Sequence, residues 1–360
     1  MIPRGAEIAP RKTRLSIARY LDAEEFVAEQ RALFRRTPTV VAHASELAEA
    51  GACVARRVAD VPIVLVNDAG RVRGFLNACR HRGAELLRPG EACTRKALVC
   101  PDHAWSYRLD GSLLHVPDEQ SFDGIACERM GLVELACELR HGLVWICPEG
   151  PLNLERFLGP ALDADLSGFA LSEHRLEATR EHHVQANWKL VMDAFAEGYH
   201  VRSLHRQSLS RFFLEAALID DLDPHVRQVG ARRSFPEAAA PTIRDDTTAF
   251  YNLFPNSIVV FHPLWISWAT LQPESVDRAR VVHRMLVHPA VQDKDKLRRS
   301  FALIDAQVFS KEDLAMAESI QRTLRSGANE HVLVGAREEG MRLFHRNRDR
   351  ALAAQLRVSR

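Results

Sequence analysis

Apolar positions near the start of the chain follow a helical spacing. Ile17, Leu21, Phe26 and Leu33 recur within residues 14–35, mostly separated by polar residues. This periodicity predicts one or two helices in the first part of the chain.

The pattern changes between residues 38 and 147, where short β-rich runs alternate with turn signals. The runs are Val61–Val66, Val72–Leu76 and Gly142–Ile146, and the turn signals are Asn67-Asp68-Ala69-Gly70, Arg88-Pro89-Gly90 and Asp110-Gly111. Such runs separated by Gly, Pro, Asn and Asp are typical of hairpins. A small antiparallel β domain is therefore predicted here.

A second region follows Pro148-Glu149-Gly150-Pro151, whose composition is typical of a domain boundary. Beyond it, the pattern predicts a strand at Leu176–Val184, a helix at Trp188–Val201, adjacent strands at Ser257–Thr270 and Arg278–His288, and an amphipathic helix at Asp313–Leu324. This mixture favours an α+β domain in which helices pack on an antiparallel sheet.

Composition excludes several classes of protein. The 360 residues include 48 basic and 47 acidic side chains, a net charge of +1. A nucleic-acid groove or an anionic membrane surface normally requires a basic excess, so neither partner is expected. No apolar run reaches the length of a membrane span, and the first residues lack the apolar stretch of a secretory signal. The seven cysteines are therefore expected to be reduced, in the cytoplasm.

Two short motifs offer metal ligands. Cys79-Arg80-His81 is followed, after an 18-residue spacer, by Cys100-Pro101-Asp102-His103. A zinc site could use two cysteines and two histidines, but zinc fingers usually place like residues in the same loop. One thiolate and one imidazole in each loop favour a Rieske [2Fe–2S] cluster, in which one iron binds both cysteines and the other both histidines. The remaining cysteines, Cys53, Cys93, Cys127, Cys137 and Cys147, are interpreted as small apolar side chains.

A second pair of histidines lies in the C-terminal region. On an ideal α-helix His200 and His205 would point about 140° apart, so both reach one metal only if the helix ends or distorts between them. A non-haem Fe(II) oxygenase uses two histidines and one carboxylate on one side of the metal, which leaves positions open for O2 and substrate.

At this point the chain resembles the α subunits of the aromatic ring-hydroxylating dioxygenase family, which are Rieske-type non-haem iron oxygenases. Its cluster loops resemble those of the family, as do Asn187-Trp188-Lys189, Glu197, Tyr199-His200 and His205. One departure is Ala194, because the family commonly has asparagine there. Glu312-Asp313 and Gln321-Arg322 resemble the family's segment with the third iron ligand, which implies Asp313. Asp313 could instead be an ordinary helix N-cap, and Glu312 and Glu318 are then the alternative ligands.

The resemblance implies an α+β architecture in three parts. Residues 1–37 would form a helical segment packing on the catalytic domain, and residues 38–148 an antiparallel β Rieske [2Fe–2S] domain. Residues 149–360 would form a helix-grip (START-like) catalytic domain, with a curved antiparallel sheet around a hydrophobic cavity.

The implied cofactors are a [2Fe–2S] cluster, bound by Cys79, His81, Cys100 and His103, and a mononuclear Fe(II), bound by His200, His205 and Asp313. The implied partners are O2, a small organic substrate and a separate NAD(P)H-dependent reductase, with or without a ferredoxin. The sequence contains no Gly-x-Gly-x-x-Gly fingerprint, so a built-in nicotinamide or flavin domain is not expected.

The resemblance also implies a homotrimer, since the family assembles head to tail. Glu197 matches the family's bridging acid, which would connect His200 to His103 of the neighbouring subunit and so carry electrons between the two metal sites. A carboxylate suits this role because it accepts N–H bonds from two imidazoles.

Four functions are open at the level of the sequence. The first is hydroxylation or dihydroxylation of a small, aromatic substrate, and its alternative is oxidative N- or O-demethylation or monooxygenation of a quaternary amine. From other classes, a Rieske electron carrier without oxygenase activity and a zinc-binding module remain. Aromatic residues suited to a cavity wall, to bind either a ring or a quaternary ammonium, are Phe250, Phe254, Phe261, Trp265 and Trp268.

Overall fold

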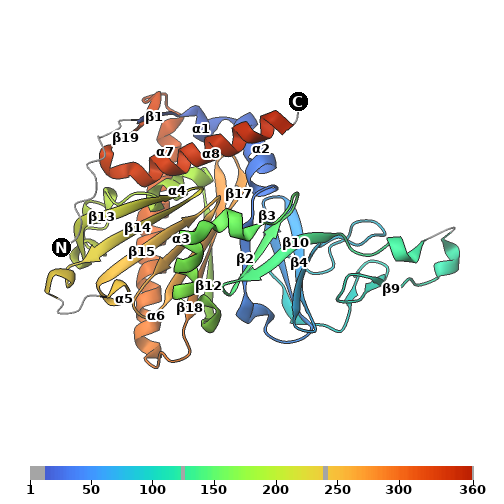
Figure 1. The fold of residues 1–360 in the computed structure, drawn as a ribbon. Helices are drawn as coiled ribbons and strands as arrows, with labels where there is room; N and C mark the ends of the chain where they lie inside the picture. Colours follow the sequence, from blue (N-terminus) through green and yellow to red (C-terminus); the bar gives the residue numbers. More distant parts are fainter. Residues whose placement is uncertain (1–12, 123–125, 238–241, 359–360) are drawn as a thin grey trace. The chain divides into compact units, whose positions relative to one another are not determined.

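The structure is a computed structural model that describes residues 13–122, 126–237 and 242–358. These residues form two compact units (Figure 1). One comprises residues 34–175, and the other combines the chain up to residue 33 with the chain from residue 176 onward. None of the described helices is both long enough and apolar enough to cross a bilayer.

The unit of residues 34–175 is built on antiparallel β-sheets. The larger sheet has the order β2-β11-β10-β5-β4-β3-β6, and the smaller one the order β7-β8-β9. Their bounds are β2 (Thr39–His43), β3 (Ala52–Val58), β4 (Val61–Asp68), β5 (Arg71–Leu76), β6 (Ala92–Thr94), β7 (Leu98–Val99), β8 (Ser106–Tyr107), β9 (Leu113–His115), β10 (Glu134–Arg140) and β11 (Leu143–Cys147). The predicted antiparallel β region is confirmed.

Tight turns set the register of this sheet. Ala69-Gly70 joins β4 to β5, and both residues have positive φ (50° and 98°), as a two-residue hairpin turn requires. His141-Gly142 joins β10 to β11 in the same way, with φ of 52° and 77°.

Helical turns and one longer helix complete this unit. They are η2 (Ala44–Leu47), η3 (Glu119–Ser121), η4 (Cys127–Arg129), α3 (Leu154–Gly168) and η5 (Leu171–Glu173). Leu154, Leu158, Leu162 and Leu166 of α3 recur every four residues and are buried. The compact unit thus continues through α3 to residue 175, beyond the boundary expected at residue 148.

The other unit contains a curved antiparallel sheet, with strand order β12-β18-β17-β16-β15-β14-β13 (Figure 1). The bounds are β12 (Arg175–Val184), β13 (Phe213–Leu222), β14 (His225–Arg232), β15 (Thr247–Leu253), β16 (Ser257–Phe261), β17 (Ile266–Ser275) and β18 (Arg278–Val287). The prediction of one strand over Ser257–Thr270 was wrong. A turn at residues 262–265, closed by a 3.0 Å bond from His262 N to Trp265 O, divides it into β16 and β17.

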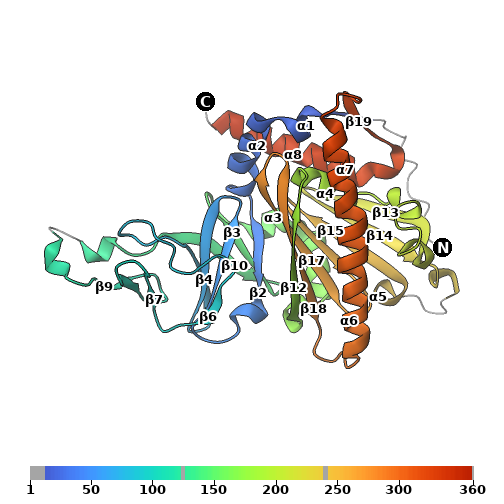
Figure 2. The same cartoon turned by 180° about the vertical axis from the view of Figure 1, so that it is seen from behind.

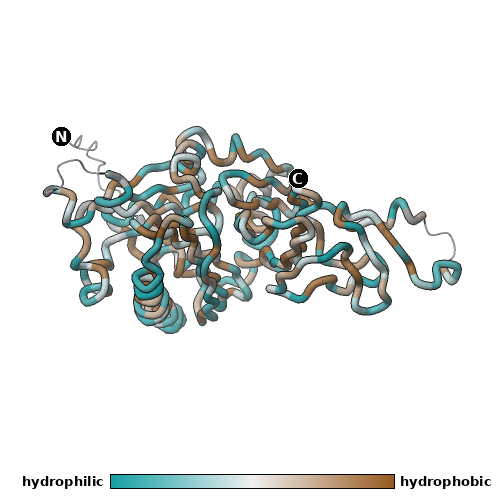
Figure 3. Tube along the Cα trace, turned by 90° about the horizontal axis from the view of Figure 1, so that it is seen from below, coloured by the Kyte–Doolittle hydropathy of each residue, from teal (hydrophilic) through white to brown (hydrophobic). Residues whose placement is uncertain are grey.

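A long helical rod crosses one face of this sheet (Figure 2). It consists of α6 (Lys294–Ala302), the π-helix η9 (Leu303–Leu314) and α7 (Ala315–Leu324). In Figure 3 hydrophobic stretches gather inside the unit, and hydrophilic ones follow the outer turns of the rod. The remaining helical segments are α4 (Trp188–Phe195), η6 (His200–Arg202), η7 (Ser210–Phe212), η8 (Phe235–Glu237), α5 (Ile243–Asp246), η10 (Ala336–Glu338) and α8 (Glu339–Val358).

The N-terminal segment belongs to this same unit. As predicted, it is largely helical, with α1 (Ala18–Leu21), α2 (Ala23–Glu29) and the π-turn η1 (Gln30–Phe34). The strand β1 (Thr13–Ser16), which pairs with β19 (His331–Val334), was not predicted.

A buried ionic cluster attaches this segment to α4 and α8. The Glu29 carboxylate accepts hydrogen bonds from Lys189 Nζ and Trp188 Nε1, both at 2.9 Å, and from Arg348 Nε at 2.6 Å. Glu29 and Lys189 are fully buried, and Arg348 is 1% exposed. Because a buried charge is tolerated only when it is paired and hydrogen-bonded, each member depends on the others.

Candidate functional site

The end of helix α4 determines where the two candidate iron-binding histidines lie. Asn187 caps the start of α4 by accepting a 3.0 Å bond from Lys189 N. The helix ends at Phe195, so the predicted helix over Trp188–Val201 was wrong in its last turns. The Glu197 carboxylate accepts bonds from the backbone N–H groups of Tyr199 and His200, and such side-chain bonds compete with helix formation.

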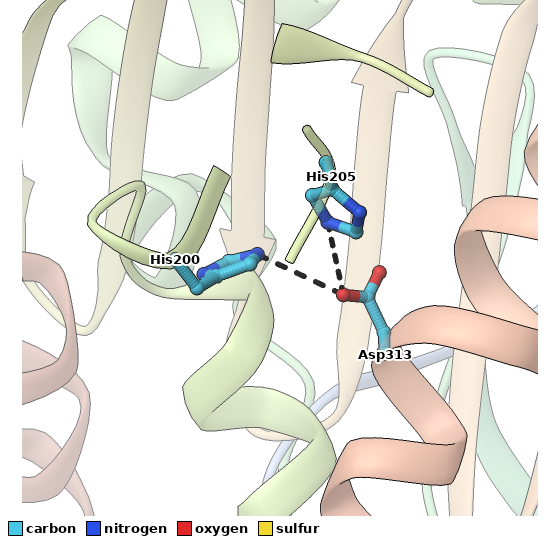
Figure 4. A group of neighbouring side chains, drawn as sticks. All are labelled: His200, His205 and Asp313. Carbon is cyan, nitrogen blue, oxygen red and sulfur yellow. Dashed lines mark ion pairs between the residues drawn. The ribbon is translucent and has the colours of Figure 1, made fainter. Parts of the chain in front are cut away.

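Because the helix ends early, His200 and His205 point toward the same place, and Asp313 joins them from the long rod (Figure 4). His205 Nε2 lies 3.0 Å from Asp313 Oδ1, and His200 Nε2 lies 3.7 Å from the same oxygen. One ligand atom from each residue falls within 4.8 Å of the others.

Asp313 is not a helix N-cap, which was one of the alternatives. It lies near the end of the π-helix η9, inside a helical rod that runs from residue 294 to residue 324. Of the two alternative ligands, Glu318 accepts a 2.9 Å bond from Gln185 N, away from the histidines. Glu312 does contact His205, but through Nδ1 at 2.6 Å, on the side of the ring opposite Asp313.

Glu312 therefore orients a histidine whose other nitrogen faces Asp313. Its carboxylate also accepts bonds from Ser208 Oγ at 2.6 Å and Gln307 Nε2 at 2.9 Å. Burial acts to raise the pKa of Glu312, but these hydrogen bonds outweigh it and hold the pKa below the usual value. Burial acts to lower the pKa of His205, but the carboxylates of Asp313 and Glu312 have the larger effect and raise that pKa.

His200 has a corresponding acidic partner. Its Nδ1 is hydrogen-bonded to the Glu197 carboxylate, and its Nε2 faces Asp313. Both imidazoles thus have Nδ1 fixed by a glutamate, which directs Nε2 toward a common point. Carboxylate–histidine pairs of this kind fix the tautomer and raise the basicity of metal ligands.

This donor set fits a non-haem iron. Two imidazole nitrogens and one carboxylate converge from one side, as in the facial triad of Fe(II) oxygenases. Asp313 is only 3% exposed, and its Oδ1 makes no hydrogen bond of normal geometry, although both imidazoles approach it. A cation bound between these groups would satisfy that buried oxygen.

The two candidate cluster loops have the same backbone geometry. In the first, Cys79 N donates to Ala84 O at 2.8 Å. In the second, Cys100 N donates to Trp105 O, also at 2.8 Å. The residue before each acceptor has a positive φ, 84° at Gly83 and 57° at Ala104. Two equivalent loops thus present two equivalent cysteine thiols.

The side chains of these loops fit a cluster with an inner and an outer iron. Cys79 and Cys100 are both 3% exposed, whereas His81 is half-buried and His103 exposed. The rings of His81 and His103 are 4.8 Å apart between centroids. Tyr107 Oη lies 3.2 Å from Cys79 Sγ, so its hydroxyl can donate to a thiolate there. Buried thiolates and outward-facing imidazoles match the ligand set of a Rieske centre.

A cavity of about 1700 Å³ opens beside His200, His205 and Asp313. One wall is a face of the curved sheet, since Gln228, Gly230 and Arg232 alternate along β14, and Thr248 and Phe250 along β15. The other wall is the rod, which contributes Leu303, Ile304, Val308 and Phe309.

Of the aromatic residues predicted for the wall, Phe250 and Trp265 line the cavity, as does Ala194. Phe254, Phe261 and Trp268 are instead buried in the core, with exposures of 4%, 2% and 0%.

Several polar residues of the cavity wall were not anticipated from the sequence. Arg232 and His262 are two of them, and Ser267 is a third. Ser267 Oγ lies 2.8 Å from His283 Nε2, His283 Nδ1 lies 2.8 Å from Asp305 Oδ1, and His182 Nε2 lies 2.8 Å from the same oxygen. These residues are scattered over the chain, so no local motif could have identified them.

Comparisons with known proteins agree with this geometry. Residues 171–354 match the family described as "Ring hydroxylating alpha subunit (catalytic domain)", and residues 37–133 match the "Rieske [2Fe-2S] domain". The carnitine monooxygenase oxygenase subunit of Escherichia coli K12 is 27% identical over 318 residues, 85% of this chain and 83% of that protein. The α subunit of biphenyl 2,3-dioxygenase from Rhodococcus jostii RHA1 is 28% identical over 203 residues, 54% of this chain and 44% of that protein.

Solved structures share the fold over nearly the whole chain. The structure of naphthalene 1,2-dioxygenase from a Rhodococcus species bound to indole has a TM-score of 0.83 at 21% identity, covering 95% of this chain and 94% of that one. A quaternary ammonium Rieske monooxygenase in complex with L-carnitine has a TM-score of 0.81 at 24% identity, covering 94% of each chain. The resemblance inferred from the sequence motifs is thereby confirmed. The chain belongs to the family of ring-hydroxylating α subunits, and it is a Rieske non-haem iron oxygenase with a [2Fe–2S] cluster and a mononuclear iron.

Proposed function

We propose that His200, His205 and Asp313 hold the mononuclear iron of this terminal oxygenase, and that Cys79, His81, Cys100 and His103 hold its Rieske cluster. The observation that carries the first assignment is the convergence of three ligand atoms within 4.8 Å beside the large cavity. The second rests on two matching loops with buried thiols and adjacent imidazoles. We assign the cluster to the unit of residues 34–175, which includes the expected domain of residues 38–148, and the iron to the unit that combines the N-terminal segment up to residue 33 with the chain from residue 176 onward.

When bound, the iron supplies the binding and reductive activation of O2. The chain itself orients the ligands, because Glu197 and Glu312 each hold an imidazole Nδ1. The cavity would enclose the substrate between apolar side chains of the rod and one face of the sheet. In a hydroxylation the substrate, O2, two electrons and two protons give the hydroxylated product and water, and the electrons come from a separate NAD(P)H-dependent reductase, directly or through a ferredoxin.

Two reactions are supported for the substrate. Hydroxylation or dihydroxylation of a small aromatic compound is favoured by Phe250 and Trp265 in the cavity wall and by the similarity to biphenyl dioxygenase. Monooxygenation or demethylation of a quaternary amine is favoured by the similarity to carnitine monooxygenase, which extends over 85% of this chain. Aromatic faces bind a quaternary ammonium through cation–π attraction, so the same wall suits both classes.

For electron transfer we propose a head-to-tail homotrimer in the cytoplasm. Glu197, already bonded to His200 Nδ1, would connect that histidine to His103 of the neighbouring subunit. The exposure of His103 supports this role, because its ring is accessible to a second subunit. Heterologous contacts of this kind form a closed ring of three when the rotation between neighbouring subunits is 120°.

Metal content and turnover together test the proposal. The wild-type chain is expected to bind three irons, and His205→Ala or Asp313→Ala two, with the Rieske absorption retained and turnover abolished. Two irons in the wild type and no turnover on either substrate class would support the electron-carrier alternative. Normal turnover of the Asp313 variant would refute the ligand assignment.

A further inference from the structure

The cavity has an excess of basic side chains in its lining. Its cationic residues are Arg202, Arg206, Arg232, Arg233, Lys296 and Arg337, and its acidic residues are Glu197, Asp245 and Asp313. Two of these acids, Glu197 and Asp313, already face the histidines of the candidate iron site. The lining therefore favours an anion over a cation as the group bound elsewhere in the cavity.

Arg232 differs from the other five cationic residues, which are all exposed. It lies at the end of β14 and is half-buried. Its Nε donates to Thr247 O at 3.2 Å and its Nη2 to Thr248 Oγ1 at 2.9 Å, and its guanidinium lies 5.7 Å from the centroid of the Phe213 ring. These contacts hold the guanidinium in one orientation at the cavity wall.

The charge of Arg232 has no close counter-ion. In the described parts of the chain, no carboxylate lies within ion-pairing distance of its guanidinium, and Asp245 and Asp246 act only at longer range. Two of its five N–H groups are used, so the end formed by Nη1 and Nη2 retains donors for a bidentate contact. A partly desolvated cation without a counter-ion is stabilised when an anion binds to it.

The surroundings of Arg232 increase this preference. Arg244 is also half-buried, and its Nε donates to Pro263 O at 3.5 Å rather than to a carboxylate. Burial, together with the charges of Arg232, His283 and Arg244, lowers the pKa of His262 to about 3, so this imidazole is neutral at pH 7. Its Nε2 is buried and has no hydrogen-bond partner among the described residues. A neutral imidazole beside a guanidinium can donate a further hydrogen bond to an anionic group.

We propose that Arg232 binds a carboxylate of the substrate, with His262 beside it, so that the enzyme acts on small organic acids. This inference rests on the proposed function, since it defines the substrate class for the same cavity. It applies equally to an aromatic acid and to a quaternary amine that also carries a carboxylate. It excludes a neutral hydrocarbon or a purely cationic amine as the preferred substrate.

The test measures binding rather than turnover, by isothermal titration calorimetry on the anaerobic holoenzyme. The probes are two matched pairs: benzoate with benzamide, and 4-(trimethylammonio)butyrate with its primary amide. In each pair the carboxylate is replaced by a neutral amide of nearly the same size, which loses the negative charge and one acceptor oxygen. At least one acid is expected to bind about ten- to a hundredfold more tightly than its amide, the value of a charge-assisted contact.

Variants then assign this preference to one residue. Arg232→Gln is expected to weaken binding of the acid by the same ten- to hundredfold and to leave its amide within about threefold. Arg232→Lys, which keeps the charge but cannot donate two parallel hydrogen bonds to a carboxylate, should give an intermediate affinity. Arg233→Gln is the matched control, because its neighbouring guanidinium lines the same cavity but is exposed, and it should change affinity by less than about threefold. Retention of the Rieske absorption and of three irons verifies that each variant is folded.

Equal binding of acid and amide, failure of both acids to bind, or equal loss of both probes in Arg232→Gln would overturn the carboxylate site. Turnover distinguishes a failure of the proposed function from a failure of the carboxylate site. If acids bind through Arg232 but no acid is oxidised with O2 and a reductase, the site stands and the oxygenase assignment is lost. If neutral compounds are oxidised equally well by wild type and Arg232→Gln, the oxygenase assignment stands and the carboxylate site is refuted.

Discussion

Replacing Glu312 by alanine tests whether the orientation of His205 sets the affinity for iron. Glu312 accepts a 2.6 Å contact from His205 Nδ1 and is itself held by Ser208 and Gln307. Loss of such a partner typically lowers metal affinity ten- to a hundredfold, about 1.4–2.7 kcal/mol. We expect a loss of this size, because the imidazole becomes free to rotate and its Nε2 less basic.

The assay is anaerobic titration of the iron-depleted catalytic site with Fe(II) in competition with a chromophoric chelator. The absorption of the Rieske cluster serves as an internal measure of intact protein. Glu312→Gln retains an acceptor oxygen and should lose less affinity than Glu312→Ala. Glu318→Ala is the matched control, since Glu318 lies on the same rod but bonds to Gln185 N.

An iron affinity within twofold of wild type in Glu312→Ala would refute the reasoning about orientation. Complete loss of iron in that variant, combined with retention in Asp313→Ala, would identify Glu312 as the ligand instead.

Four further predictions concern other parts of the molecule. Glu29→Ala should lower the free energy of unfolding by about 3–5 kcal/mol, because the fully buried Lys189 loses its paired carboxylate, while Arg348 keeps Glu25 and Asp349. A decrease of less than about 1 kcal/mol in urea denaturation would contradict this. Tyr107→Phe removes the hydroxyl that can donate to Cys79 Sγ, a hydrogen bond worth about 1 kcal/mol, and should lower the Rieske reduction potential by roughly 40 mV in a redox titration. An unchanged potential would argue against that bond. Although burial opposes it, hydrogen bonds from His182 and His283 hold the pKa of Asp305 well below its usual value, so the ionised carboxylate stabilises the fold above about pH 4 and this stabilisation is lost as the pH falls. Asp305→Asn should therefore make the free energy of unfolding less dependent on pH below about pH 4, and a pH profile identical to that of wild type would contradict this. Glu197→Ala also removes the carboxylate partner of His200 Nδ1, so it is tested with saturating Fe(II). With three irons bound it should retain the trimer but nearly stop oxidation of the pre-reduced cluster in a single turnover, and a wild-type rate would exclude the bridging role.

The residues that the fold brings together at the two candidate metal sites could be selected from the sequence, because motif spacing reflects ligand chemistry. Cys79, His81, Cys100 and His103 lie in two short loops, and these loops do share one backbone geometry. The strands and turns around them were predictable too, since alternating apolar runs and Gly-containing turns are local signals.

The exact course of the chain at the candidate iron site was not predictable. Apolar residues continue at helical spacing beyond Phe195, so periodicity alone extended helix α4 too far. Just after the helix ends, the Glu197 carboxylate accepts hydrogen bonds from the backbone N–H groups of Tyr199 and His200, and a hydropathy pattern does not reveal such bonds.

The π-helix was equally hidden. Neighbouring residues of an α-helix point about 100° apart, and the wider π turns of η9 reduce that angle. Glu312 and Asp313 can therefore contact opposite nitrogens of one imidazole. No sequence motif marks Arg232 as a binding residue, because it lines a cavity only once the sheet and the rod have come together.

The cluster of Glu29, Lys189 and Arg348 has a consequence for synthesis on the ribosome. Glu29 and Arg348 are separated by 319 positions, and the whole of the unit of residues 34–175 is made between them. At about 5–20 residues per second, roughly 15–65 s pass between the emergence of the carboxylate and that of its last cation. During that time Glu29 remains hydrated, while the inserted unit has all the residues it needs to fold. The nascent chain therefore folds from the inside out, and α2 completes its contacts only when α8 has been made.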